Sequence, residues 1–132
     1  MRGHSFNVRV YYEDTDFSGN VYHAAYLHFF ERARTEFLRD EGIHHSELIK
    51  EGIAFAVRKM EIDFARAAHI DDELVVTTEL VEMSGARFVL DQAITRGGEL
   101  IATARVLAVA MKTDGRATRL PKALLSAFAP KG

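Results

Sequence analysis

The sequence predicts an α+β fold in which a curved antiparallel sheet wraps around one long central helix. Residues 22–41 carry apolar side chains at helical spacing, which predicts a long helix with a broad hydrophobic face. Strand-like segments follow this helix, and turn signals such as Gly97-Gly98 separate the later ones. Because apolar residues occupy much of the helix circumference, they need wide cover, which a curved sheet provides better than a flat one.

Composition places the chain among ordinary globular domains. Its 132 residues, 48% of them apolar, predict one domain over residues 1–132 with a substantial core. The formal net charge of −2 argues against nucleic-acid binding, which usually needs a basic surface. The absence of cysteine excludes disulfides and cysteine-based metal sites or nucleophiles. No apolar run resembles a signal peptide or approaches the roughly 18 residues of a membrane span. We therefore expect a soluble cytoplasmic protein without an integral membrane segment.

The first elements expected are a strand, a loop and the long helix. Residues 6–12 alternate apolar and polar side chains, as a half-buried strand does. The loop over 13–20 contains Ser18-Gly19-Asn20, which is a turn signal. The helix over 22–41 presents aromatic residues on one side and charged residues on the other, and Gly42 marks its end.

Strand patterns dominate the second half of the chain. Strands are predicted over 53–67, 72–82, 86–96 and 99–113, and a short terminal helix over 120–128. Consecutive hairpins would make the later strands antiparallel. Residues 106–111 are apolar on both faces, which indicates a central, covered strand. The apolar edge or face left by these strands would suit a partner subunit.

A group of polar residues collects where the first strand meets the long helix. Asp14 and Asp16 lie in the loop, Tyr12 ends the strand, and His23 lies in the first helical turn. The first N–H groups of a helix have no partner inside it and carry partial positive charge, which suits a developing oxyanion. Since Gly19 lets the chain fold back tightly, an upstream carboxylate can reach the same space. A carboxylate, N–H groups and an imidazole are the minimum set for acyl transfer to water.

The same residues also suit structural roles. An aspartate before a helix is more often a helix cap or an Asx turn than a catalytic group, so Asp16 has this alternative. A histidine in the first turn is at least as often structural as catalytic, and Tyr12 taken alone is typical of a core residue. Asp14 and Thr15 suit a local task, the fixing of the loop by hydrogen bonds to its backbone.

The stretch VRVYYEDTDFSGNVYHAAYLHFFERARTEFLR, residues 8–39, resembles the N-terminal signature of the 4-hydroxybenzoyl-CoA thioesterase family of hotdog-fold proteins. The pattern is Y-x-D-T-D-x-x-G-x-V-Y-H-x-x-Y followed by F-x-E-x-A-R, and it is most similar to the Tol–Pal-associated, YbgC-like acyl-CoA thioesterases. The later segment RKMEIDFARAAHIDDELVV resembles the family less specifically. The resemblance implies a hotdog fold and an acyl-CoA thioesterase that releases free acid and CoA without a cofactor.

The resemblance also implies roles for single residues. Asp16 matches the family's catalytic carboxylate. His23 matches the active-site histidine of the YbgC-like group, and its backbone N–H occupies the place where the family polarises the thioester carbonyl. Tyr12 matches a tyrosine that lines the site. Direct attack by Asp16 on the thioester and activation of a water molecule by Asp16 both stay open.

The predicted substrate contacts surround these residues. We expect Gly19, Val21 and Tyr26 to line the substrate site. Arg58 and Lys59 rank first among the cations for the CoA phosphates, because they interrupt an apolar strand. The other available cations have a solvated strand face as their alternative; they are Arg66, Arg87, Arg96, Lys112, Arg116 and Arg119. The aromatic residues that could bound the acyl group, or equally belong to the core, are Phe17, Phe29, Phe55 and Phe64.

The resemblance finally implies partners and leaves alternative functions open. We expect acyl-CoA as substrate, acyl carrier protein as a second possible carrier, and a homo-oligomer built from hotdog dimers, with a tetramer expected. A hotdog hydratase or dehydratase is one alternative, and a non-catalytic acyl-thioester-binding protein is another. The His44-His45 pair lacks further ligands at suitable spacing and suits a loop and cap, so we expect no metal site.

Overall fold

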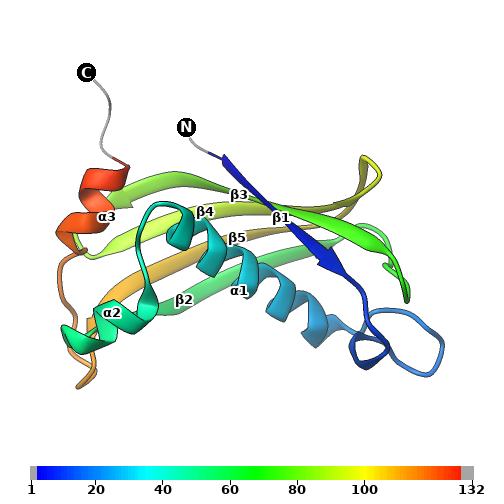
Figure 1. The fold of residues 1–132 in the computed structure, drawn as a ribbon, viewed down its shortest axis with the longest axis horizontal. Helices are drawn as coiled ribbons and strands as arrows, with labels where there is room; N and C mark the ends of the chain where they lie inside the picture. Colours follow the sequence, from blue (N-terminus) through cyan, green and yellow to red (C-terminus); the bar gives the residue numbers. More distant parts are fainter. Residues whose placement is uncertain (1–2, 129–132) are drawn as a thin grey trace.

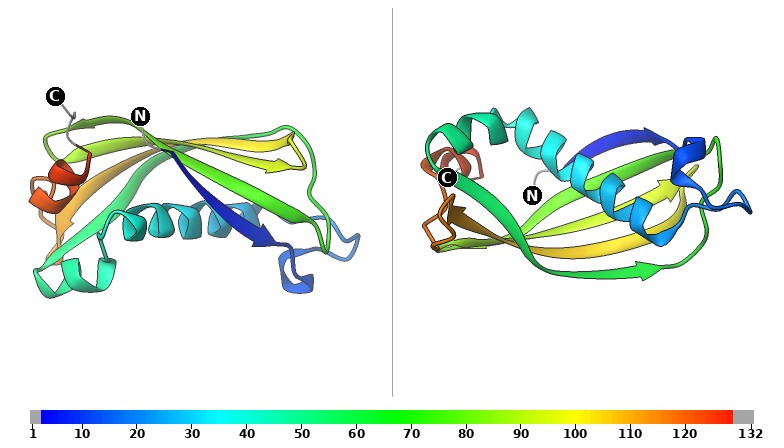
Figure 2. Two further views of the ribbon diagram at one scale, coloured as in Figure 1. Left: turned by 45° about the horizontal axis from the view of Figure 1, so that its top comes forward. Right: turned by 90° about the horizontal axis from the view of Figure 1, so that it is seen from below.

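A five-stranded antiparallel sheet curves around helix α1 (His23–Asp40) in the computed structural model, which describes residues 3–128 (Figure 1). The strands are β1 (Gly3–Arg9), β2 (Ile53–Phe64), β3 (Glu73–Ser84), β4 (Arg87–Arg96) and β5 (Glu99–Lys112). The shorter helices are η1 (Tyr12–Asp14), α2 (His45–Lys50) and α3 (Lys122–Ala127). The predicted fold class is therefore confirmed, and α1 lies along the concave side of the sheet (Figure 2).

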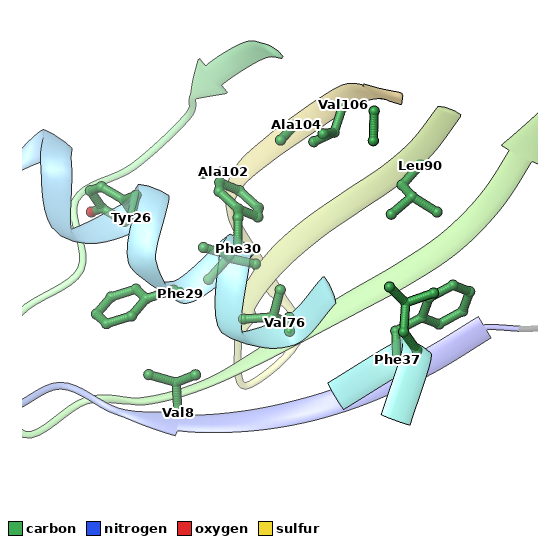
Figure 3. Close-up of a cluster of buried hydrophobic side chains, with 14 of the residues drawn as sticks. Val8, Tyr26, Phe29, Phe30, Phe37, Val76, Leu90, Ala102, Ala104 and Val106 are labelled. Atoms are coloured by element: carbon green, nitrogen blue, oxygen red, sulfur yellow. The ribbon is translucent and has the colours of Figure 1, made fainter. Parts of the chain in front are cut away.

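The core forms between one face of α1 and the concave face of the sheet. The buried positions of α1 recur every three or four residues: Ala25, Tyr26, Phe29, Phe30, Ala33, Phe37 and Leu38. Phe29 and Phe30 are fully buried and belong to one cluster with strand residues such as Val76 and Leu90 (Figure 3). Removing either ring would cost about 3–5 kcal/mol. The same packing fixes the direction of α1 and thus the place where it begins.

The strand order β1-β3-β4-β5-β2 differs in one respect from a run of consecutive hairpins. Strands β3, β4 and β5 form hairpins as predicted, but β2 pairs with β5 and is separated from β3 by β4 and β5. The chain after β2 therefore crosses to the other side of the sheet. At its start the amides of Ala65 and Arg66 donate to the Ile101 carbonyl of β5, and at its end Asp71 N–H donates to the Val10 carbonyl beyond β1. This crossover, residues 65–72, passes beside the start of α1.

The predicted central position of 99–113 is confirmed, because β5 lies between β4 and β2. Among the residues that the structure describes, only the concave face of β5 is fully covered. Ala104 and Val106 are buried on that face, whereas Leu107 and Val109 on the other face are half-buried. The apolar outer face explains why the sequence suggested cover on both sides.

Three local predictions are wrong in detail. The strand expected over 6–12 ends at Arg9, because the chain turns into η1 at Tyr12. Tyr12 is consequently 80% exposed and is not a core residue. The loop and cap expected at His44-His45 are only part of the local structure: His44 takes the cap position, but the short helix α2 that follows was not predicted, and it buries Leu48. Of the helices that the structure describes, none combines the length and apolarity needed to cross a membrane.

Candidate active site

The loop between η1 and α1 is fixed by its own polar side chains. The Asp14 carboxylate accepts a hydrogen bond from Tyr11 N–H at 2.9 Å, and the Thr15 hydroxyl donates to the Tyr12 carbonyl at 2.8 Å. The local roles predicted for Asp14 and Thr15 are thus confirmed. Gly19 then reverses the chain with a φ of 83°, in the left-handed region that glycine adopts at little cost. The reversal returns the chain to the start of α1.

Asp16 carries an ionised carboxylate at the surface of this loop. Its Oδ1 accepts hydrogen bonds from the Ser18 hydroxyl at 2.5 Å and the Ser18 N–H at 2.9 Å. The Ser18 hydroxyl, followed by the Ser18 backbone, lowers the pKa of Asp16 because both donors stabilise the charged form. The contact with Ser18 N–H is the Asx turn that was the structural alternative for this residue. It also holds the carboxylate as an anion, which is the form required of a base or nucleophile.

A pocket of about 470 Å³ opens beside this carboxylate. Its lining comes from the loop, the first turn of α1, the end of β2 and the crossover: Asp16, Asn20, Val21, Tyr22, His23, Tyr26, Phe64, Ala65, Arg66 and Ala67. Tyr22, in extended conformation, precedes α1, and both Tyr22 and His23 line the pocket, so the first helical turn with its N–H groups begins at the pocket wall. Their partial positive charge is available to an oxygen that gains negative charge there.

Aromatic rings form the apolar wall of the pocket. The His23 ring lies 4.7 Å from Phe64, centre to centre, and Phe64 contacts Tyr26 edge-on at 5.3 Å. The Tyr26 hydroxyl accepts a hydrogen bond from the N–H of Ala68 at 3.0 Å, and the Ala68 carbonyl accepts one from Val21 N–H at 2.9 Å. Burial raises the pKa of Tyr26, so its hydroxyl stays protonated. These contacts attach the crossover to α1 and to the loop.

The structure brings some of the predicted site residues together and leaves others apart. Asp16, Val21, His23 and Tyr26 line the same pocket, and Gly19 forms the turn beside it. The remaining three predicted residues, Tyr12, Arg58 and Lys59, do not line it in the described chain.

Each of these three side chains has a different position. Tyr12 points to solvent from η1. Arg58 lies at the irregular step of edge strand β2, where the register shifts between Val57 and Lys59. Lys59 pairs with Glu61 at 3.1 Å.

Six lining residues were not predicted for the site itself, and three of them have aromatic or long side chains. Tyr22 directly precedes the predicted histidine, Phe64 was considered only as a boundary of the acyl group, and Arg66 was one cation among many. The sequence did contain one indication that Phe64 and Arg66 could belong to the site: they lie near the end of a predicted strand, where site residues are often found. Within residues 3–128, no group of three or more His, Asp or Glu side chains is arranged to hold a metal ion.

A larger hollow of about 740 Å³ lies on the outer face of the sheet, but its chemistry is different. Short runs of strand residues line it, among them Glu79, Asp91 and Arg105. Asp91 and Arg105 are already paired, with the guanidinium donating to both carboxylate oxygens at 2.8 and 2.9 Å. No helix begins at its lining residues. The Asp16 pocket is therefore the better candidate for chemistry.

Comparison with known proteins assigns the chain to a family. A family model described as the thioesterase-like superfamily matches residues 10–128. The chain belongs to this superfamily. It is 50% identical over 105 residues to the acyl-CoA thioesterase YbgC of Haemophilus influenzae. This alignment covers 79% of this chain and 77% of that protein. It is 44% identical over 125 residues to the acyl-CoA thioester hydrolase YbgC of Escherichia coli O6:H1, with 92% of each chain covered.

Solved structures agree with this assignment. The probable thioesterase from Bartonella henselae superposes with a TM-score of 0.86 at 46% identity, covering 91% of this chain and all of that chain. The predicted hotdog fold is confirmed by this likeness together with the curved sheet around α1. The resemblance of the loop–helix signature to the thioesterase family is confirmed as well.

Proposed function

We propose that this chain is an acyl-CoA thioesterase, which hydrolyses the thioester of acyl-CoA to the free acid and CoA, with Asp16 as the reacting carboxylate. One observation carries the proposal: an anionic carboxylate and the first turn of α1 line one pocket, together with His23. The two relatives described above, which align with 79% and 92% of this chain, are named as an acyl-CoA thioesterase and an acyl-CoA thioester hydrolase, which supports the substrate class.

In the proposed hydrolysis, the start of the helix and the loop have different tasks. The thioester carbonyl oxygen gains negative charge when its carbon is attacked, and the N–H of His23 at the helix start is suited to bind that oxygen. The His23 ring and Phe64 would cover one side of the thioester and limit the access of bulk water. Asp16 would then act from the opposing loop.

Two balanced routes are available to Asp16. As a nucleophile, its oxygen bonds to the carbonyl carbon while the carbon–sulfur bond breaks; CoA leaves as the thiolate, and water hydrolyses the mixed anhydride. As a general base, Asp16 takes a proton from water while the water oxygen bonds to the carbon and the thiolate leaves; that proton then goes to the thiolate. Both routes need the ionised form that Ser18 stabilises.

The proposal also includes the oligomeric state, the cellular location and the acyl carrier. We propose a homo-oligomer of hotdog dimers, because the exposed edge strand β2 and the half-buried outer residues Leu107 and Val109 suit contacts between copies. Tyr12, Arg58 and Lys59 would gain their predicted roles through such contacts. Acyl-CoA chemistry favours a cytoplasmic location, and acyl carrier protein as a carrier and a Tol–Pal connection are expectations from the family resemblance.

A panel of thioesters tests the proposed class. Short-chain, long-chain and aromatic acyl-CoAs should be hydrolysed by the wild-type protein, with thiol release followed over time, and the Asp16→Asn variant should lose most of this rate. The same preparations should show no hydration of crotonyl-CoA. Hydration would instead identify a hydratase, and tight acyl-CoA binding without turnover by the wild type would identify a binding protein.

A further inference from the structure

A series of ion pairs links Asp72, at the end of the crossover, to Arg66, which lines the Asp16 pocket. Arg96, at the end of β4, contacts Asp72 at 2.7 Å and Glu99 at 2.6 Å, and it also donates to the Ala67 carbonyl at 3.2 Å. The other carboxylate oxygen of Glu99 lies 3.3 Å from Nε of Arg66. The four side chains therefore alternate in charge in the order Asp72, Arg96, Glu99 and Arg66.

The side chains at the Asp72 end of this series of ion pairs are more buried than Arg66 at its other end. The side chains of Arg96 and Asp72 are 29% and 23% exposed, whereas that of Arg66 is 63% exposed. The Arg96 guanidinium lowers the pKa of Glu99, so Glu99 stays anionic and continues to attract Arg66. Arg66 thus ends a fixed series of charges at a position open to solvent.

Arg66 keeps unused donors in this arrangement. Its contact with Glu99 involves Nε, and its side chain donates no hydrogen bond to any residue that the structure describes. The two terminal nitrogens of a guanidinium form a planar fork that fits phosphate oxygens. Of the described residues lining the Asp16 pocket, Arg66 alone carries a permanent positive charge.

We propose that Arg66 binds the phosphates of the CoA moiety and that Glu99 orients it for this task. The inference rests on the proposed function and names a cation other than Arg58 and Lys59, which the sequence analysis ranked first. Asp16 and the helix start would engage the thioester, so the pantetheine arm leads outward and the anionic nucleotide end meets the exposed guanidinium. Phosphate would use the terminal nitrogens while Nε remains with Glu99.

Thioesters that share an acyl group but differ in phosphate content test the proposal. The KM of the Arg66→Gln variant should rise about fivefold for the acyl-CoA and stay unchanged for the acyl-pantetheine, which has no phosphate, with kcat unchanged for both. An acyl-dephospho-CoA tells whether the 3′-phosphate or the pyrophosphate supplies the contact. Arg66→Lys, which keeps the charge without the fork, should recover part of the loss.

Arg105→Gln is the matched control. Arg105 is 60% exposed and also paired with a carboxylate, but it lies on the outer face of the sheet. Its loss should change none of these KM values, which excludes a general effect of net charge. An unchanged KM of Arg66→Gln for acyl-CoA, or an equal rise for acyl-pantetheine, would overturn the proposal.

Failure of the proposed function gives a different result. In that case Asp16→Asn would hydrolyse the acyl-pantetheine as fast as the wild type, whatever the Arg66 variants do. Binding of CoA to the Asp16→Asn variant, measured by calorimetry, adds a readout independent of turnover. Adding Arg66→Gln to that variant should weaken CoA binding about fivefold and leave pantetheine binding unchanged.

Discussion

Removal of the Tyr26 hydroxyl should destabilise the contact that attaches the crossover to α1. In Tyr26→Phe the ring keeps its packing, so no cavity forms, but the N–H of Ala68 loses the acceptor that lies 3.0 Å away. Ala68 is fully buried and Tyr26 is 2% exposed, so water cannot replace the hydroxyl. A buried donor left without a partner costs about 1–3 kcal/mol, and we expect about 2 kcal/mol.

Urea unfolding and thermal unfolding measure this cost directly. For a domain of this size, about 2 kcal/mol corresponds to a fall in Tm of roughly 6–8 °C. Tyr12→Phe is the matched control, because Tyr12 is 80% exposed and its hydroxyl makes no hydrogen bond to a described residue. It should change stability by less than about 0.5 kcal/mol. A loss below about 0.5 kcal/mol in Tyr26→Phe would refute the reasoning that this bond anchors the crossover.

Three further perturbations address the loop and the core. Gly19→Ala and Gly85→Ala should each lower the free energy of unfolding by about 1–2 kcal/mol, because both glycines have a positive φ, of 83° and 59°. Only the change at Gly19 should also reduce kcat/KM. Ser18→Ala should raise the pKa of Asp16 towards its usual value, which moves the acidic limb of the kcat/KM–pH profile to higher pH and leaves the neutral rate unchanged. Gln92→Leu should cost about 2–3 kcal/mol, since this buried amide is hydrogen-bonded to the helix, to a neighbouring strand and to an arginine.

Each of these expectations has a contradicting result. Equal losses of kcat/KM in the two glycine variants would show that the turn at Gly19 does not position the site. An acidic limb that stays in place in Ser18→Ala would show that the profile does not report Asp16. Unfolding of Gln92→Leu at the wild-type urea concentration would show that the buried amide contributes no net stability.

The sequence was sufficient for those parts of the fold that depend on neighbours along the chain. The apolar period of α1 and the glycine turns between β3, β4 and β5 are local signals, and the structure confirms both. The pairing of β2 with β5 depends on contacts between distant segments, and alternation within β2 is the same whichever strand lies beside it. Helices α2 and α3 have six residues each, too few to show a clear helical period, and only α3 was predicted.

In the candidate site too, the residues of one local motif were predicted, whereas the residues brought in by distant segments were not. Asp16 and His23 are close in sequence and belong to one motif, so the motif predicts that they meet. Phe64 and Arg66 reach the pocket because the crossover bends back to hydrogen-bond with α1, which no local pattern encodes. Tyr12 was misplaced because strand alternation was continued beyond Arg9, where the chain begins a tight helical turn.

The kcat of Asp16→Asn beside that of Asp14→Asn tests the central claim most directly. Both changes remove one carboxylate charge from the same loop, but Asp14 is hydrogen-bonded to Tyr11 N–H, whereas Asp16 lines the pocket. With one acyl-CoA at saturation, Asp16→Asn should lower kcat by about 10²–10⁴-fold, and Asp14→Asn should lower it by far less. Hydrolysis by Asp16→Asn at the wild-type kcat would contradict the account.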